Sequence, residues 1–150
     1  MIAKLISGGQ TGVDRAALDV ALARDIPHGG WCPRGRRAED GTIPARYLLT
    51  ETSSRSYAAR TEQNVLEADA TLILAQGCLR GGTKLTRGKA REHGKPCLVV
   101  DLAVECPSPA DVRNWLAETN VRVLNVAGPR ESQAPGIYGL ATTFLAQVLS

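Results

Sequence analysis

Four short apolar runs, separated by helical patterns, constrain the fold of this 150-residue chain more than any other feature. The runs are rich in Ile, Leu and Val and mostly do not alternate with polar residues, which is typical of strands covered on both faces. They span residues 2–6, 70–75, 97–100 and 121–126, and a weaker fifth candidate spans residues 48–51. Strands that alternate with helices predict an α/β fold with a doubly wound, mainly parallel sheet, and the length fits a single domain over residues 1–150.

Five helical patterns lie between and after these runs. Three of them cover residues 12–24, 56–67 and 83–93. A fourth begins at Ser108, where Pro109 at the first helical position and Asp111 two residues later resemble a capping box. The fifth follows Gly136, and its apolar residues recur at helical spacing, which predicts one buried face formed by Ile137, Leu140, Ala141, Phe144, Leu145 and Val148.

Composition and charge exclude several classes of protein. With 43% hydrophobic and 22% charged residues the chain is expected to fold, and no apolar run approaches the roughly 20 residues of a membrane span. The formal net charge of +3 is too small for a polycation, and the six aromatic residues are too scattered for a base-stacking platform. We therefore expect neither a nucleic-acid partner nor a membrane.

The cysteines and histidines predict a reduced, cytoplasmic protein without a metal site. The apolar stretch at the N-terminus is too short for a signal peptide. Cys32, Cys78, Cys97 and Cys106 show no zinc-ligand spacing with one another or with the two histidines. Neither histidine is predicted at a strand end beside a carboxylate, so catalysis by histidine is not expected.

A glycine-rich segment follows the first apolar run and opens the first helical pattern. It matches the dinucleotide fingerprint G-x-G-x-x-G at its second and third glycines but has Ser7 in place of the first. Glycines allow a phosphate to approach the backbone, and a helix N-terminus attracts negative charge. The alternative is a tight structural turn. The candidate phosphate-binding residues are Ser7, Gly8, Gly9, Gln10, Thr11 and Gly12.

A second glycine-rich segment follows the run at residues 70–75. Gly81 and Gly82 could present backbone N–H groups to an anion, and Thr83 offers a hydroxyl at the predicted start of a helix. Residues 80–95 contain six Lys or Arg and one Glu, so that all of the positive excess of the chain lies beside this segment. The alternative for Lys89, Arg91 and Lys95 is a solvated basic helix face.

Three arginines and one asparagine complete the predicted site. Arg130, after the last apolar run, has the planar guanidinium that suits phosphate, although it could instead pair with Glu131 at the surface. Arg34 lies with two more arginines in the long segment 27–47, which could form a lid over an anion or carry solvated loop charges. Arg60 and Asn64 share one helix face, and a hydrogen bond at the edge of the core is the alternative role for Asn64.

Taken together, these motifs resemble those of the molybdenum carrier proteins of the circularly permuted YpsA branch of the SLOG superfamily. The resemblance covers nearly the whole chain and rests on residues 7–15, 30–35, 60–65, 81–83 and 124–132. It implies a Rossmann-like SLOG-type ligand-binding domain, a pocket for a nucleotide-type ligand, and self-association. It also implies a phosphorylated heterocycle as ligand, with the molybdenum cofactor as candidate cargo.

The same superfamily includes the LOG phosphoribohydrolases, which cleave nucleoside monophosphates. Their signature ends in a glutamate, and this chain has Thr86 at that place. A binding or carrier protein is therefore the leading hypothesis, and a LOG-like N-glycosidase is the alternative. Such an enzyme would need a carboxylate from elsewhere, for which the candidates are Asp14, Asp101 and Glu131.

Overall fold

The computed structural model describes residues 2–150, and five parallel strands form its central sheet. The strands lie in the order β2-β1-β9-β7-β8, and every neighbouring pair is parallel. Their bounds are β1 Lys4–Ile6, β2 His28–Gly29, β7 Ala70–Ala75, β8 Cys97–Asp101 and β9 Val123–Ala127. The expected doubly wound α/β fold with a parallel sheet and a single domain is confirmed.

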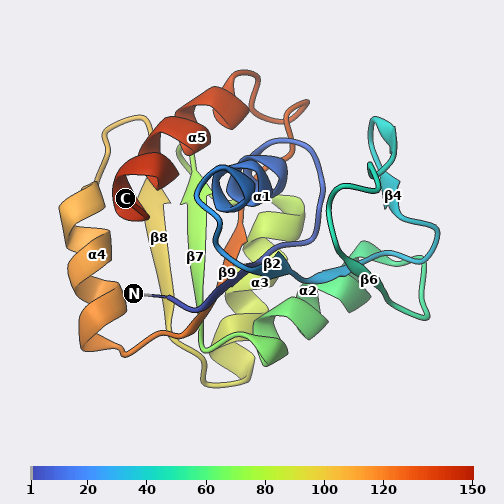
Figure 1. Cartoon of the computed structure of the whole chain (residues 1–150), viewed down its shortest axis with the longest axis horizontal. Helices are drawn as coiled ribbons and strands as arrows, with labels where there is room; N and C mark the ends of the chain where they lie inside the picture. Colours follow the sequence, from blue (N-terminus) through green and yellow to red (C-terminus); the bar gives the residue numbers. More distant parts are fainter. Residues whose placement is uncertain (1) are drawn as a thin grey trace.

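Five helices cover the two faces of the sheet (Figure 1). One layer contains α1, α5 and α4, with α5 packed against both of the others, and α2 packs against α3 in the other layer. The fourth helix begins with the expected capping box between Ser108 and Asp111. The bounds are α1 Val13–Ala23, α2 Tyr57–Glu67, α3 Gly81–Glu92, α4 Pro109–Glu118 and α5 Ile137–Val148.

The fifth strand of the central sheet is not the one expected from the sequence. Residues 48–51 were the weaker strand candidate, but the edge strand next to β1 is the two-residue β2. Within residues 48–51 only β6, Thr50–Glu51, is extended, and it pairs with β3, Trp31–Cys32, in a separate two-stranded sheet. Two residues are too few for a periodic apolar pattern, so the sequence carries no signal for β2.

The long segment 27–47 folds beside α2, at one side of the molecule (Figure 1). It contains β2, β3 and the antiparallel pair β4, Arg37–Ala38, with β5, Gly41–Thr42. Tyr47 and Ile43 of this segment are buried and belong to the main core. The segment is therefore anchored to the body of the protein at both ends and in its middle.

The hydrophobic core lies on both sides of β7 and β9. All six residues of β7 are buried, as expected for a strand covered on two faces. In α5 the apolar face was predicted correctly at five positions, since Ile137, Ala141, Phe144, Leu145 and Val148 are buried. The expectation for Leu140 was wrong, because this side chain is 43% exposed.

The strand order places three loops together at one edge of the sheet. The chain builds the sheet outward from β1, crosses to β7 and β8, and returns with β9 between β1 and β7. The carboxyl ends of β1, β9 and β7 are therefore neighbours. Ligands of open α/β sheets bind at such a reversal of strand order, beyond the carboxyl ends.

Candidate functional site

A cavity of about 240 Å³ opens beyond the carboxyl ends of these strands. Its walls come from the loop after β1, the first turns of α2 and α3, and the loop after β9. Five residues of the predicted site line it, namely Gln10, Arg60, Gly82, Thr83 and Arg130. The other lining residues are Asp14, Tyr57, Thr61, Leu85, Thr86, Ala127, Gly128 and Gln133.

The glycine-rich loop after β1 is folded around a carboxylate of its own chain. Asp14, in the first turn of α1, is 2% exposed and accepts a hydrogen bond from the Gln10 N–H at 3.3 Å. The Thr11 N–H donates to Gln10 Oε1 at 3.1 Å, and the Gly9 N–H donates to Ser7 Oγ at 3.4 Å. Three of the amides that could have bound phosphate thus have internal acceptors.

Two glycines of this loop lie in close contact with neighbouring segments. A Cβ on Gly8 would lie 2.1 Å from a guanidinium nitrogen of Arg60, which crosses the loop at this point. Gly12 has a φ of +79°, and a Cβ there would lie 2.4 Å from the Pro129 carbonyl oxygen. At Gly12 the close neighbours are backbone atoms, so this glycine allows the loop after β9 to pack against the start of α1. At Gly8 the neighbour is the end of the flexible Arg60 side chain, which could shift.

Burial raises the pKa of Asp14 above its ordinary value of 3.8, and the positive charge of Arg60 opposes this rise. Arg60 NH1 lies 3.4 Å from Asp14 Oδ2, and the backbone N–H groups of Gln10 and Gly8 also favour the ionised carboxylate. Desolvation has the larger effect, so the cavity wall disfavours negative charge on this side chain. Asp14 is nonetheless the one carboxylate among the lining residues.

The N-terminus of α3 points two free amides toward this edge of the sheet. The helix begins at Gly81, two residues earlier than expected, so both glycines lie in its first turn. Within residues 2–150 the N–H groups of Gly81 and Gly82 have no hydrogen-bond acceptor, whereas the Thr83 N–H donates to the Arg80 carbonyl at 3.1 Å. Free N–H groups at a helix N-terminus bind anions.

Two arginines of the lining retain unused hydrogen-bonding capacity. The buried Nε of Arg60 has no partner within residues 2–150. Arg130 makes only a loose ion pair with Glu39, with 3.9 Å between Arg130 Nε and Glu39 Oε2. Both guanidinium groups lie 5.9 Å from the ring centre of Tyr57. A ring that gathers two cations beside a cavity places them where an anion could contact both.

Arg34 and its neighbours do not line the cavity. Arg34 is exposed. Arg36 donates to the carbonyl oxygens of Ile43, Leu49, Pro44 and Tyr47, so it holds the long segment together. Arg37 lies over the Tyr57 ring at 4.5 Å from its centre. Of the three arginines considered for a lid, only Arg37 thus approaches the cavity, through Tyr57.

Asn64 forms the hydrogen bonds that join α2 to β3. Its Oδ1 accepts from the Trp31 N–H at 2.8 Å, and its Nδ2 donates to the Trp31 carbonyl at 3.0 Å. The side chain is 2% exposed and does not line the cavity. The structure thus shows the alternative role, a hydrogen bond at the edge of the core.

Replacing Asn64 with alanine is therefore expected to lower the free energy of unfolding by about 2–3 kcal/mol, because both backbone groups of Trp31 lose their partners. Gln63→Ala, at the exposed neighbouring position of the same helix, should change it by less than about 0.5 kcal/mol. Urea denaturation of both variants measures the difference. Equal stability of the two variants would contradict this role for Asn64.

The basic residues of 80–95 mostly lie outside the cavity. Lys95 donates to the Ala68 carbonyl at 3.0 Å, and Lys89 pairs with Glu62 and Glu92 at 3.3 Å each. The positive charge that lines the cavity comes instead from Arg60 and Arg130, which lie elsewhere in the sequence.

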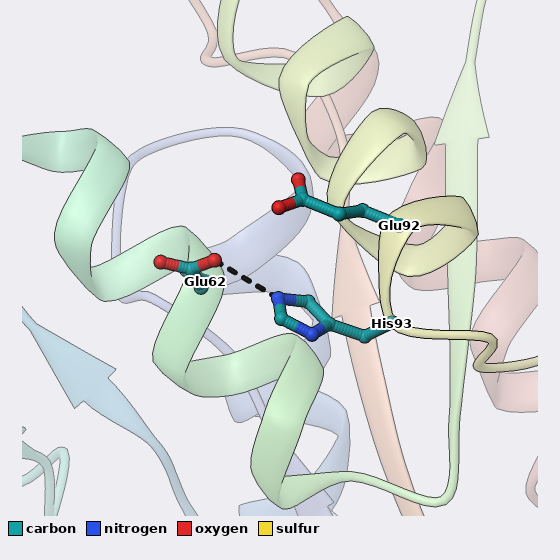
Figure 2. Close-up of side chains that lie close together, drawn as sticks. All are labelled: Glu62, Glu92 and His93. Carbon is teal, nitrogen blue, oxygen red and sulfur yellow. Dashed lines mark hydrogen bonds and ion pairs between the residues drawn. The ribbon is translucent and has the colours of Figure 1, made fainter.

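His93 does contact a carboxylate, which the sequence did not predict. Figure 2 shows His93, at the end of α3, reaching across to Glu62 of α2. The His93 Nε2 lies 2.9 Å from Glu62 Oε2. The ligand atoms of Glu62, Glu92 and His93 lie close enough together to hold a metal ion. The Lys89 ammonium already pairs with both carboxylates, so this cluster joins two helices with its positive charge supplied by lysine.

Sequence reasoning missed several lining residues for a physical reason. Tyr57 and Thr61 lie one helical turn apart on the face that carries Arg60, and the helical pattern could have indicated them. Asp14 was a candidate for the alternative enzyme but not for the ligand-binding site. Gln133 lies in an irregular loop and has no periodic signal.

The fold and the cavity define an α/β protein with a cavity, lined by two arginines and the first turn of a helix, at the carboxyl ends of its parallel strands. The model of the circularly permutated YpsA SLOG family matches residues 5–149, so the chain belongs to this family. The crystal structure of a protein from Syntrophus aciditrophicus SB, described as a putative molybdenum carrier protein, is similar to this chain with a TM-score of 0.94 and 46% sequence identity. The match covers 99% of this chain and 96% of that one. No match is found among curated proteins.

Two findings bear on the expected surroundings of the protein. None of the helices within residues 2–150 is long and apolar enough to span a bilayer. The four cysteines form no disulfide; Cys32 is buried, whereas Cys78 and Cys106 are exposed. The cytoplasmic location and the self-association stay predictions.

Proposed function

We propose that the protein binds a phosphorylated heterocyclic ligand, with its phosphate between the N-terminus of α3 and the guanidinium groups of Arg60 and Arg130. The observation that carries the proposal is the convergence of unused donors from three segments on one cavity: the Gly82 N–H, the Arg60 Nε and the Arg130 guanidinium. Donors without internal acceptors at the mouth of a cavity favour an external anion.

The remaining residues of the predicted site support the cavity from behind. Ser7, Gly8, Gly9, Thr11 and Gly12 shape the loop that orients Asp14 and Arg60, and Gln10 lines the wall. Thr83 contributes its buried side chain to the cavity, whereas Gly81 begins α3 and does not line the cavity. We propose no ligand contact for Arg34 or Asn64, because one is exposed away from the cavity and the other is bonded to Trp31.

The molybdenum cofactor is our first candidate for the ligand, and nucleoside monophosphates are the second. Support for a molybdenum-containing ligand comes from the description of the Syntrophus protein as a putative molybdenum carrier protein. Support common to both candidates is the phosphate group that each carries. On this proposal the protein is a binding or carrier protein that acts by holding and releasing its ligand.

Calorimetric titration tests the proposal with inorganic phosphate, AMP, GMP and molybdenum cofactor. Arg60→Gln and Arg130→Gln are each expected to weaken binding about 10- to 100-fold, the loss expected for a hydrogen bond to a charged group. Arg91→Gln is the matched control, because it removes the same charge from an exposed position that does not line the cavity. Absence of binding by the whole panel, or equal losses in all three variants, would contradict the proposal.

A LOG-like N-glycosidase is the second candidate, and one observation favours it. Of the three carboxylates considered, only Asp14 lines the cavity. Glu131 accepts from the N–H groups of Gly136 and Tyr138 at the start of α5, and Asp101 accepts from Ala103 N–H. Chromatography of AMP and GMP incubated with the protein tests for free base. Release that is lost in Asp14→Asn would support this candidate, and no release at high protein concentration would count against it.

A further inference from the structure

A second cavity lies on the other side of the α3 N-terminus. It encloses about 490 Å³ and adjoins the first cavity, since Thr83 and Gln133 line both. Its floor is the carboxyl end of β7 at Ala75, and its walls are the loop before α3 and the loop between β9 and α5. Thr83, in the first turn of α3, therefore stands between two connected cavities.

The two cavities differ in chemistry. Three charged side chains line the first, namely Asp14, Arg60 and Arg130. Arg80 is the one charged residue among those lining the second, and half of the lining residues there are apolar, namely Ala75, Leu79, Pro129, Ala134 and Pro135. The first cavity thus brings two guanidinium groups to one ligand group, whereas the second, with a single exposed arginine, has room for an uncharged group.

The sizes of the cavities point the same way. Small-molecule sites typically enclose about 300–1,000 Å³. The first cavity, at about 240 Å³, is smaller than this range, whereas the second, at about 490 Å³, lies within it. If a phosphorylated heterocycle were confined to the first cavity, the donors of the cavity would match its phosphate. Little space would remain for the heterocyclic part of the ligand.

We propose that the ligand binds across both cavities, with its phosphate in the first and its uncharged heterocyclic part in the second. This inference rests on the proposed function and adds the subsite that selects the heterocycle. The amides of Gln76 and Gln133 make no side-chain hydrogen bond within residues 2–150, and each offers a donor and an acceptor to the edge of a heterocycle. No aromatic ring lines this subsite, so selection there rests on apolar packing and amide contacts.

The arrangement separates binding from hydrolysis. Asp14 lines only the first cavity, beside the phosphate. A glycosidic bond held in the second cavity would not face this carboxylate. The subsite therefore supports a binding protein over an N-glycosidase.

Cys78 allows a test on the unaltered protein, because its exposed thiol lines the second cavity. AMP or GMP is expected to slow alkylation of Cys78 by iodoacetamide at least about fivefold at saturation, since a ligand that fills a pocket buries most of its surface there. Inorganic phosphate should leave the rate unchanged, because it occupies only the first cavity. Cys106, which is exposed and lines neither cavity, is the internal control, with its modification followed by mass spectrometry.

Filling the second cavity gives an independent measurement. Leu79→Trp and Ala134→Leu are each expected to weaken AMP and GMP binding about 10-fold or more, which is the range for a steric change in a ligand pocket. Both should leave the affinity for inorganic phosphate within about twofold, and this retained binding also shows that the variants are folded. Leu66→Trp is the matched control, at a 41% exposed leucine on α2.

The outcomes separate this inference from the proposed function. Slower alkylation of Cys78 by phosphate as well as by nucleotide, or equal losses of phosphate and nucleotide affinity in the filled variants, would overturn the second subsite. The second subsite would also be overturned if the wild type bound AMP and GMP no more tightly than phosphate. Phosphate binding would in that case still support the anion site. If neither phosphate nor any phosphorylated ligand binds the wild type, the proposed function itself fails.

Discussion

Gly30→Ala is expected to lower the free energy of unfolding by about 3–5 kcal/mol, the largest effect of any substitution considered. Gly30 links β2 to β3 with a φ of +125°, which L-residues rarely adopt. A Cβ at this position would lie 2.2 Å from the Ser7 carbonyl oxygen and 2.8 Å from the Ser7 nitrogen. Both neighbours are backbone atoms at the end of β1, so neither can move without disturbing the sheet.

Gly41→Ala is the matched control for this substitution. Gly41 has a similar φ of +115°, but no atom lies within 4 Å of the position its Cβ would take. Only the backbone strain remains, so a loss of about 1–2 kcal/mol is expected. Chemical denaturation followed by circular dichroism compares the two. A loss in Gly30→Ala no greater than that in Gly41→Ala would show that the loop after β1 can yield.

Asp14→Ala is expected to cost about 2–4 kcal/mol, because several polar groups lose one shared partner. The Gln10 N–H donates to this carboxylate at 3.3 Å, and Arg60 pairs with it at 3.4 Å. The loss should appear in urea denaturation of the protein without ligand. A change below about 0.5 kcal/mol would mean that the loop does not depend on this carboxylate.

Asp14→Asn is the matched variant, since it keeps an oxygen acceptor and removes only the charge. The folded protein raises the pKa of Asp14 above 3.8, so the folded state holds more protons than the unfolded state over the interval between the two pKa values. The wild type should therefore lose stability relative to Asp14→Asn as the pH rises above about 4. A stability difference that moves the opposite way with pH would contradict burial as the dominant cause.

The element pattern was predictable because it is a local property of the chain. Apolar runs of Ile, Leu and Val gave β7, β8 and β9 to within a few residues, and the capping residues Ser108 and Asp111 marked the start of α4. The glycine-rich loops could be placed for the same reason, since each follows directly on a buried strand. The features that the sequence did not predict are short or irregular. β2 has two residues, and Gln133 lies in a loop without periodicity.

The location of the site could be predicted from the sequence better than the roles of its residues. Periodicity predicted a parallel sheet, which places the loops after β1, β7 and β9 at the same edge of the sheet, and the cavity lies there. The roles of single residues depend on partners far away in the sequence. The Asp14 carboxylate accepts from the Gln10 N–H, which a phosphate could have used. The Asn64 amide bonds to both backbone groups of Trp31, and the Arg36 guanidinium donates to four carbonyl oxygens.

The sequence by itself thus determined the α/β class, the parallel sheet and the family, because hydrophobic periodicity and contiguous motifs depend only on residues that are close together in the sequence. Only the tertiary structure decided where the positive charge of the site comes from. The basic residues of 80–95 mostly pair with α2 and its C-terminal end or lie at the surface. Arg60 and Arg130, which are 70 residues apart in the sequence, both line the cavity. Electrostatic attraction acts through space, so the charge of a site follows from the fold and not from the composition of the nearest segment.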